Sequence, residues 1–258
     1  PIVAGERRFT VRRGRRSLDP VTPGIDDGAV DAGETLALLR LAAADGIRRM
    51  VATPHINPGY FDNDRNTITS ALAVARARVL EHQIPIQLAA AAEVRLTDQL
   101  MSAIEQQQLP FLGMWQGQQV LLLELPHSHV PAGTDKLLKW LGKKQIIAMI
   151  AHPERNREIQ ANPQLLQRLQ SAGCLFQLTA SSLLGDLGDR HQQCADMLVR
   201  QRIYQVMASD CHNLQRRPPK LQQARQQLAQ LTDDHYADAL VSGHPALITA
   251  SLDFGGSQ

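Results

Sequence analysis

The sequence lacks the features that mark disulfide-rich, membrane-spanning or secreted proteins. Of its 258 residues only 4% are aromatic and three are cysteines, namely Cys174, Cys194 and Cys211. Cysteines so few and so scattered do not form a disulfide framework, and they favour a reducing, cytoplasmic location. No apolar run approaches the roughly 20 residues that cross a bilayer. No apolar segment follows the N-terminal arginines as a signal peptide requires. We expect neither membrane insertion nor secretion.

An excess of positive over negative charge is confined to the N-terminus. Residues 1–16 carry six arginines and one glutamate, while the whole chain has a formal net charge of +2, so the remainder is net acidic. Such an arm is typical of a solvated, disordered tail, with contact to nucleic acid or membrane lipid as the alternative. The rest of the chain has no basic stripe with interleaved aromatics, so we expect no nucleic-acid partner. We therefore expect a disordered basic arm over 1–16 and one domain over 17–258.

Apolar strand-like runs and amphipathic helical segments alternate along the chain. Helices are expected between Asp31 and Gly46 and over residues 65–82, 97–107, 131–142, 163–172, 189–201, 219–231, 233–242 and 244–252. Strands that alternate with helices at this spacing form βαβ units and a parallel sheet. A chain of about 250 residues is the usual length of one α/β barrel. The pattern predicts a single α/β domain.

Polar side chains follow the apolar runs at the point where each run ends. Five runs end at His55, Glu93, Glu124, His152 and Asp210, with His212 just beyond Asp210; a sixth ends in hydroxyls at Thr179, Ser181 and Ser182. In parallel sheets and barrels the active site forms at the carboxyl ends of strands. One such histidine alone is usually a hydrogen-bonded core residue. Several imidazoles and carboxylates together are ligands for hard or borderline metal ions, so the sequence predicts a metalloenzyme.

These residues lie in motifs that occur in a fixed order. The motifs are Pro-Gly-Ile-Asp-Asp-Gly (23–28), Ala-Thr-Pro-His (52–55), Ala-Glu-Val (92–94), Leu-Glu (123–124), Ala-His-Pro-Glu-Arg (151–155), Ala-Ser-Asp-Cys-His-Asn (208–213) and Arg-Pro-Pro (217–219). In this combination, over about residues 23–250, the chain resembles the bacterial tyrosine-protein phosphatases of capsular and exopolysaccharide synthesis. These enzymes belong to the polymerase and histidinol phosphatase (PHP) superfamily. The resemblance implies a distorted, TIM-like (β/α)7 barrel and a metal-dependent phosphoric monoester hydrolase.

The resemblance also implies a set of site residues. The metal ligands fall into three positions: Asp27, His55 and His212 in the first, Glu93, Glu124 and His152 in the second, and Asp210 in the third, which Glu93 bridges. Arg155 and Arg217 match the phosphate-binding arginines, and a guanidinium suits phosphate because it binds two oxygens at once. Mn²⁺ is the expected cation, with Zn²⁺, Fe²⁺, Mg²⁺ and Co²⁺ as alternatives. The implied reaction is attack of metal-activated water on phosphotyrosine.

One motif of the family is missing. Its members begin with a His-x-His strand shortly before Asp-Asp-Gly, whereas Leu18 and Pro20 stand at those positions here. Neither side chain binds a metal, and proline interrupts a strand. Two explanations remain open. Either a shifted reading frame or a misplaced start has removed the first strand, or the protein is a catalytically impaired barrel that binds phosphoproteins.

Two short motifs, C-x5-R and H-x-H, match known functional signatures by residue type but not by their expected local structure. Residues 194–200 satisfy the C-x5-R signature of cysteine-dependent tyrosine phosphatases, but they contain no glycine and form an apolar helical face rather than a phosphate-cradling turn. His127 and His129 form an H-x-H in a proline-flanked loop, for which we expect a loop role before a contact with substrate or metal. Glu154 is expected to cap or pair in the helix after His152 rather than to act as an acid.

The substrate follows from the resemblance alone. It implies a phosphotyrosine protein, and in particular a bacterial tyrosine kinase that controls polysaccharide export. A PHP phosphomonoesterase acting on a small metabolite, such as histidinol phosphate, is the alternative from the same superfamily. The sequence leaves the oligomeric state open, a homo-oligomer included.

Overall fold

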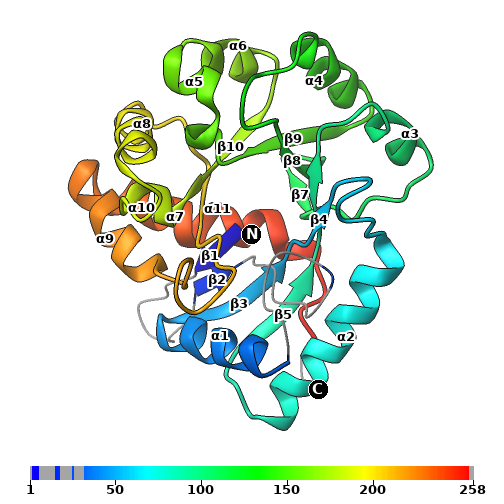
Figure 1. The fold of residues 1–258 in the computed structure, drawn as a ribbon, viewed down its shortest axis with the longest axis vertical. Coiled ribbons are helices and arrows are strands. Elements are labelled where there is room, and N and C mark those ends of the chain that lie inside the picture. The colour runs from blue at the N-terminus through cyan, green and yellow to red at the C-terminus, as the bar shows by residue number, and fades with distance from the viewer. Residues whose placement is uncertain (1, 6–14, 18–24, 26–31, 256–258) are drawn as a thin grey trace.

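The computed structural model describes residues 2–5, 15–17, 25 and 32–255 and places helices around a centre of strands (Figure 1). The strands are β1 (Ile2–Gly5), β2 (Arg15–Ser17), β3 (Ile47–Ala52), β4 (His55–Ile56), β5 (Gln87–Ala90), β6 (Glu93–Arg95), β7 (Met114–Trp115), β8 (Gln118–Glu124), β9 (Ile146–Ala151), β10 (Leu175–Thr179) and β11 (Val206–Ala208). The helices are α1 (Ala32–Ala44), α2 (Arg65–Glu81), α3 (Leu100–Glu105), α4 (Thr134–Lys143), α5 (Arg157–Ala161), α6 (Leu165–Ser171), α7 (Ala180–Leu183), α8 (Asp189–Arg200), α9 (Leu221–Leu231), α10 (Asp234–Asp238) and α11 (His244–Ile248). A short 3-10 turn, η1 (Pro153–Arg155), follows β9.

The strands form two sheets, and the chain passes directly from one sheet into the other at two points. One sheet has the order β1-β2-β3-β5, and the other has the order β11-β10-β9-β8-β6-β4 with β7 at the side. The backbone runs from β3 into β4 and from β5 into β6 with only two residues between them, and Ala91 N donates to Ala52 O at 2.8 Å across this joint. On the other side β1 packs against β11. The expected α/β barrel is confirmed, although no ladder joins β1 to β11 in the described part of the chain.

Helix α1 shows how the sequence pattern produces these elements. Leu36, Leu39 and Ala43, which lie on one helical face, are buried. Gly46 follows the helix with a φ of +90°, and its N–H donates to Ala43 O at 3.1 Å. Glycine is the residue that adopts this left-handed conformation at no steric cost. The predicted helix and its glycine C-terminus are therefore confirmed, whereas the predicted cap Asp31 lies outside the described residues.

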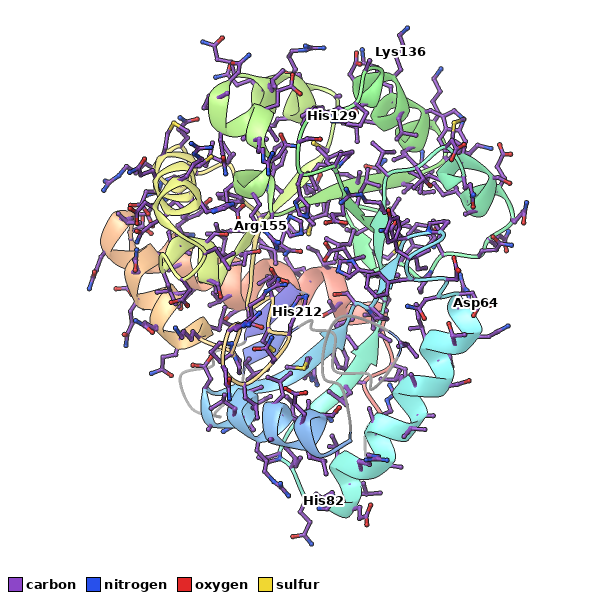
Figure 2. All side chains as sticks on the ribbon, in the orientation of Figure 1. Asp64, His82, His129, Lys136, Arg155 and His212 are labelled. Carbon is purple, nitrogen blue, oxygen red and sulfur yellow. The ribbon has the colours of Figure 1, made fainter. Side chains whose placement is uncertain are left out.

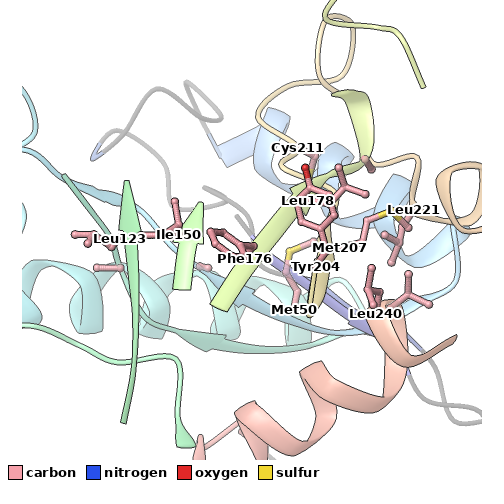
Figure 3. Close-up of a cluster of buried hydrophobic side chains, with 14 of the residues drawn as sticks. Met50, Leu123, Ile150, Phe176, Leu178, Tyr204, Met207, Cys211, Leu221 and Leu240 are labelled. Atoms are coloured by element: carbon pink, nitrogen blue, oxygen red, sulfur yellow. The ribbon is translucent and has the colours of Figure 1, made fainter. Parts of the chain in front are cut away.

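Strand alternation divides the buried side chains into an outer and an inner cluster. The outer cluster packs the strands against the surrounding helices and includes Met50, Leu123, Ile150, Phe176 and Tyr204 (Figure 3). The inner cluster comprises Val51, Ala89, Ala91, Leu112, Val120, Leu122, Met149, Ala151, Leu175, Val206, Ala208, Ile248 and Phe254. Its members come from the strands, the adjoining loops and the C-terminal segment, and none comes from α1 to α9, so it fills the inside of the barrel. Every second residue along a strand faces inward. Beyond the last apolar residue, the next inward position is therefore one of the polar residues at the strand end.

The structure departs from the expected elements in local detail. The run that reaches His55 is broken after Ala52, and the run that reaches Glu93 is broken after Ala90, so both residues begin new short strands. Short helix α7 was not expected, and the helix expected after His152 is the short α5. Strands β1 and β2 pair with β3, so these pieces of the expected arm lie in a sheet; the division at residue 16 stays a prediction because 6–14 lie outside the described residues. No helix in the described part of the chain has the length and apolar character that a membrane crossing needs.

Candidate metal centre

Three of the predicted ligands meet at the ends of adjacent strands. His55 on β4 lies in register with Glu93 on β6, and Glu124 ends the neighbouring strand β8. Each offers one ligand atom, and these atoms all lie within 4.8 Å of one another. Glu93 is completely buried, Glu124 is 6% exposed and His55 is partly buried. Two carboxylates this close inside a protein repel each other unless positive charge balances them.

His152 lies next to both glutamates. Its Nε2 lies 2.9 Å from Glu93 Oε1 and 3.9 Å from Glu124 Oε1. Alternation along β9 would point His152 away from the inside, because Met149 and Ala151 belong to the inner cluster. A φ of +32° at His152 turns the side chain back toward the two glutamates. Such a backbone costs about 1–3 kcal/mol and is typical of functional sites.

Asp210 forms a second focus of charge, at the end of β11. It is 1% exposed and has a φ of +54°. Its Oδ2 accepts from Arg155 Nη1 at 3.0 Å and from Thr179 Oγ1 at 3.3 Å, and Arg217 contacts the same oxygen. Its Oδ1 is buried and has no hydrogen-bond partner among the described residues. An orphaned buried carboxylate oxygen is what a cation ligand presents before the cation binds.

His212 lies beside Asp210 with a defined orientation. Its Nδ1 lies 2.9 Å from the backbone oxygen of Asp210 and 3.6 Å from Asp210 Oδ1. The ring is buried. A histidine whose Nδ1 is held by a backbone oxygen presents Nε2 to a metal. Asp27, the third residue of this predicted position, lies outside the described residues.

The charges around the two buried acids favour their ionised forms. Burial alone would raise the pKa of Glu93, but nearby positive charge, including that of His152 and His55, holds it well below its usual range. Burial likewise acts to raise the pKa of Asp210, and Arg217, His212 and Arg155 overcome it and lower that pKa. Both residues are therefore carboxylates at neutral pH. Buried carboxylates with imidazoles beside them fit a divalent cation.

Two residues that contact the cluster were not predicted as part of it: Arg95 was not singled out in the sequence, and His127 was assigned a loop role. Arg95 Nη1 lies 2.8 Å from Glu124 Oε2; its position two residues after Glu93, on the same face of a strand, was the available signal. His127 Nε2 lies 3.5 Å from Glu124 Oε1, and its ring stacks on that of His152 at 6.0 Å. Partial burial and then Arg155 lower the pKa of His127 to about 4. The loop role expected for His127 is thus incomplete, since the side chain reaches the cluster.

Beneath the site a buried network holds the turn that carries Arg155. Glu154 is completely buried, and it accepts from Thr179 N and from Tyr204 Oη, each at 3.1 Å. Burial raises the pKa of Glu154. Glu154 therefore pairs rather than facing the cluster, as expected, but its partners are β10 and Tyr204 rather than the helix.

The C-x5-R segment is a helix and not a phosphate-binding loop. Cys194 lies within α8 and is buried against the outer cluster. Burial, followed by the charge of Glu154, raises the pKa of its thiol to about 12. A thiol with this pKa is not a nucleophile at neutral pH.

An α/β barrel that gathers imidazoles, carboxylates and two arginines at its strand ends belongs to the metal-dependent hydrolases. The chain is 34% identical over 204 residues to the tyrosine-protein phosphatase YwqE of Bacillus subtilis, a match that covers 79% of each chain. The family described as capsular polysaccharide synthesis, CpsB/CapC, matches residues 20–249, and the chain belongs to this family.

Solved structures agree with this assignment. A structure from work on YwqE of Bacillus subtilis and CpsB of Streptococcus pneumoniae, described as metal-dependent tyrosine phosphatases, superposes with a TM-score of 0.78 at 31% identity and covers 90% of this chain and 91% of that one. A probable 2-pyrone-4,6-dicarboxylic acid hydrolase from Acinetobacter baumannii covers 91% of this chain with a TM-score of 0.51 at 14% identity and shares the fold alone. The predicted PHP-type tyrosine phosphatase family and the barrel are confirmed.

Proposed function

We propose that this chain is a metal-dependent protein-tyrosine phosphatase that acts in capsular or exopolysaccharide synthesis. One observation carries the proposal: a buried group of carboxylates and imidazoles lies at the strand ends, beside two arginines that share one carboxylate oxygen. Cation ligands and guanidiniums together suit a phosphate monoester, whose oxygens need positive charge from more than one side.

Glu93, Glu124 and His152 would hold one divalent cation, with Glu93 reaching a neighbouring position. His55 and His212, with Asp27, would hold another, and Asp210 would serve the third. The buried, hydrogen-bond-free Oδ1 of Asp210 supports its role. When bound, divalent cations lower the pKa of water and stabilise charge on phosphoryl oxygens. We propose Mn²⁺ as the physiological cation.

Arg155 and Arg217 would bind and orient the phosphate. Their side chains are 20% and 18% exposed, so they lie at the edge of the site where a ligand can reach them. Both rest on Asp210, which fixes their direction before the substrate arrives. A phosphate accepts paired N–H groups from each guanidinium and brings more negative charge than one carboxylate. These two arginines are therefore our candidate catalytic residues.

The substrate would be a phosphotyrosine protein, and the relatives named as tyrosine-protein phosphatases support this choice. We propose a tyrosine kinase of polysaccharide export as the partner. A cytoplasmic location, expected from the cysteine pattern, stays a prediction.

Two substrates separate this function from its nearest alternative. A phosphotyrosine peptide and histidinol phosphate should be compared at equal concentration with Mn²⁺ present. We expect phosphotyrosine to give the higher kcat/KM, while a preference for histidinol phosphate would assign the chain to a small metabolite.

Metal analysis with p-nitrophenyl phosphate turnover separates both enzymes from a phosphoprotein-binding barrel. We expect turnover that rises with added Mn²⁺. Bound metal without hydrolysis at any Mn²⁺ concentration would contradict the enzymatic function and favour a phosphoprotein-binding barrel. Leu18 and Pro20, which stand where the family has two histidines, are the reason for testing this alternative.

A further inference from the structure

The carboxylate of Glu124 is divided between two kinds of partner. Its Oε2 pairs with Arg95 Nη1 at 2.8 Å. Its Oε1 faces two imidazoles, His152 Nε2 at 3.9 Å and His127 Nε2 at 3.5 Å. Because Arg95 occupies one oxygen, Glu124 offers the other to a cation, and two histidine nitrogens lie on that side.

We propose that His127 is an additional metal ligand at the position of Glu93, Glu124 and His152. It turns that position into a set of two imidazoles and two carboxylates, which selects Zn²⁺ over Mn²⁺. This inference rests on the metal centre of the proposed function and names a residue outside the ligand set that the motifs imply.

The distance from each histidine to its neighbouring carboxylate suits a shared ion. Nitrogen and oxygen ligands lie about 2.0–2.2 Å from tetrahedral zinc, so neighbouring ligand atoms are roughly 3.4 Å apart. His127 Nε2 lies 3.5 Å from Glu124 Oε1, and His152 Nε2 lies 2.9 Å from Glu93 Oε1. The rings of His127 and His152 stack with an angle of 24° between their planes. Parallel rings bring both nitrogens to the same carboxylate oxygen.

The loop holds His127 in place but leaves its ring room to adjust. Its backbone oxygen accepts from Arg157 N at 2.8 Å, which ties it to α5. Its side chain is 50% exposed. A fixed backbone with a partly exposed ring can complete a coordination sphere by a small rotation.

His129 provides the contrast within the same loop. Its Nδ1 pairs with Ser128 Oγ at 2.8 Å, and Figure 2 shows it away from Arg155, toward the rim of the barrel. Its backbone oxygen accepts from Asn156 Nδ2 at 2.9 Å. The two histidines are both exposed and stand two residues apart, yet only His127 contacts a described member of the cluster.

A fourth protein ligand has a consequence for the reaction. Catalytic zinc sites use three protein ligands and keep one position open, whereas sites with four protein ligands are closed. Mn²⁺ accepts more ligands and prefers oxygen, so it can bind here with a position still open. We therefore expect Zn²⁺ to bind tightly and inhibit, and His127 to be the residue responsible.

Zinc affinity tests this role directly. Apo-protein is titrated with Zn²⁺ in competition with a chromogenic chelator, for the parent chain, His127→Phe and His129→Phe. We expect His127→Phe to weaken Zn²⁺ binding by on the order of 10- to 100-fold, at least the effect of losing an outer-shell partner. We expect His129→Phe to match the parent. With Co²⁺ in place of zinc, His127→Phe should also lose visible absorption, because four-coordinate cobalt absorbs more strongly than six-coordinate cobalt.

His152→Ala distinguishes a failure of this inference from a failure of the metal centre. If His152→Ala weakens Zn²⁺ binding while His127→Phe leaves it unchanged, His127 is no ligand and the proposed function stands. If neither substitution changes Zn²⁺ binding, the metal centre itself is overturned. If His129→Phe weakens binding as much as His127→Phe does, the effect belongs to the loop and the assignment of His127 fails.

Discussion

The two halves of the site balance their buried carboxylates in different ways. In the half formed by β6, β8 and β9, Glu93 and Glu124 face the imidazole of His152. In the half at β11, Asp210 faces the guanidiniums of Arg155 and Arg217. A histidine ring can give up its proton and bind a metal through the freed nitrogen, whereas guanidinium always keeps its charge and binds no metal. On the proposed assignment the first half holds a cation through imidazole and carboxylates alone, whereas the second half adds two guanidiniums that can bind an anion.

This difference assigns separate tasks to residues that are close in sequence. His152 and Arg155 are separated only by Pro153 and Glu154, within and before the turn η1. The positive φ of His152 turns its ring toward the glutamates, while Arg155 reaches across to Asp210. Loss of His152 should reduce cation binding, and loss of Arg155 or Arg217 should reduce phosphate binding.

The largest effect is expected from the first half. His152→Ala removes the imidazole between Glu93 and Glu124 and leaves two buried carboxylates facing each other. Losing cation stabilisation worth several kcal/mol should lower kcat/KM on a phosphotyrosine peptide by roughly a thousandfold or more. Cation affinity, measured by equilibrium dialysis, should fall with it. Unchanged affinity in His152→Ala would remove the distinction between the halves; His129→Ala serves as the control.

A smaller loss of a different kind is expected from the second half. Arg155→Ala removes one charged donor, worth about 1.5–3 kcal/mol, so kcat/KM should fall about 10- to 100-fold. Cation affinity should not weaken, because Arg155 pairs with Asp210 and its own positive charge opposes a nearby cation rather than holding it. Steady-state kinetics and dialysis on the same preparation check both statements. Arg157→Ala, an exposed arginine two residues away, should behave as the parent chain.

The network under η1 should affect stability more than chemistry. Glu154→Gln keeps the volume but replaces one carboxylate acceptor with an amide, which cannot accept from both Thr179 N and Tyr204 Oη. A buried donor left without its acceptor costs about 1–3 kcal/mol, which lowers Tm by several degrees in a chain of this size. Thermal unfolding followed by circular dichroism measures it, with the exposed Glu81→Gln as control. An unchanged Tm would show that the network does not hold the turn.

The smallest effect is expected at Cys194. Cys194→Ser should leave phosphatase activity within about twofold of the parent, because the thiol lies in α8 and burial raises its pKa to about 12. Iodoacetamide should likewise fail to inactivate the native protein. Loss of activity in a folded Cys194→Ser protein would contradict the metal mechanism and indicate cysteine-dependent hydrolysis.

Much of the first half could be predicted from the sequence, because it obeys a simple period. Glu93 and Glu124, and His55 on the adjoining strand β4, continue the inward face of apolar strands, and alternation carries that face from the inner cluster to these proposed ligands. His152 breaks the period, since its position is out of phase with Met149 and Ala151. The direction of its side chain depends on a backbone φ of +32°, which the sequence pattern does not predict.

Contacts between distant side chains were harder to predict. Arg155 and Arg217 pair with one oxygen of Asp210, and this tertiary contact cannot be read from the local sequence around any of the three. The short helices α5 and α7, with five and four residues, are too short to show a helical period. His127 lies in a loop, where neither period applies, so only the fold could bring it to Glu124.

The central claim is that strand-end histidines and carboxylates hold the cations on which phosphate hydrolysis depends. The direct measurement strips the protein with a chelator, returns Mn²⁺ in steps, and follows bound Mn²⁺ and p-nitrophenyl phosphate turnover on the same samples. Turnover should be absent in the stripped protein and should rise in proportion to bound Mn²⁺, with His152→Ala recovering neither. Full turnover by the stripped protein, or by His152→Ala without bound Mn²⁺, would contradict the account.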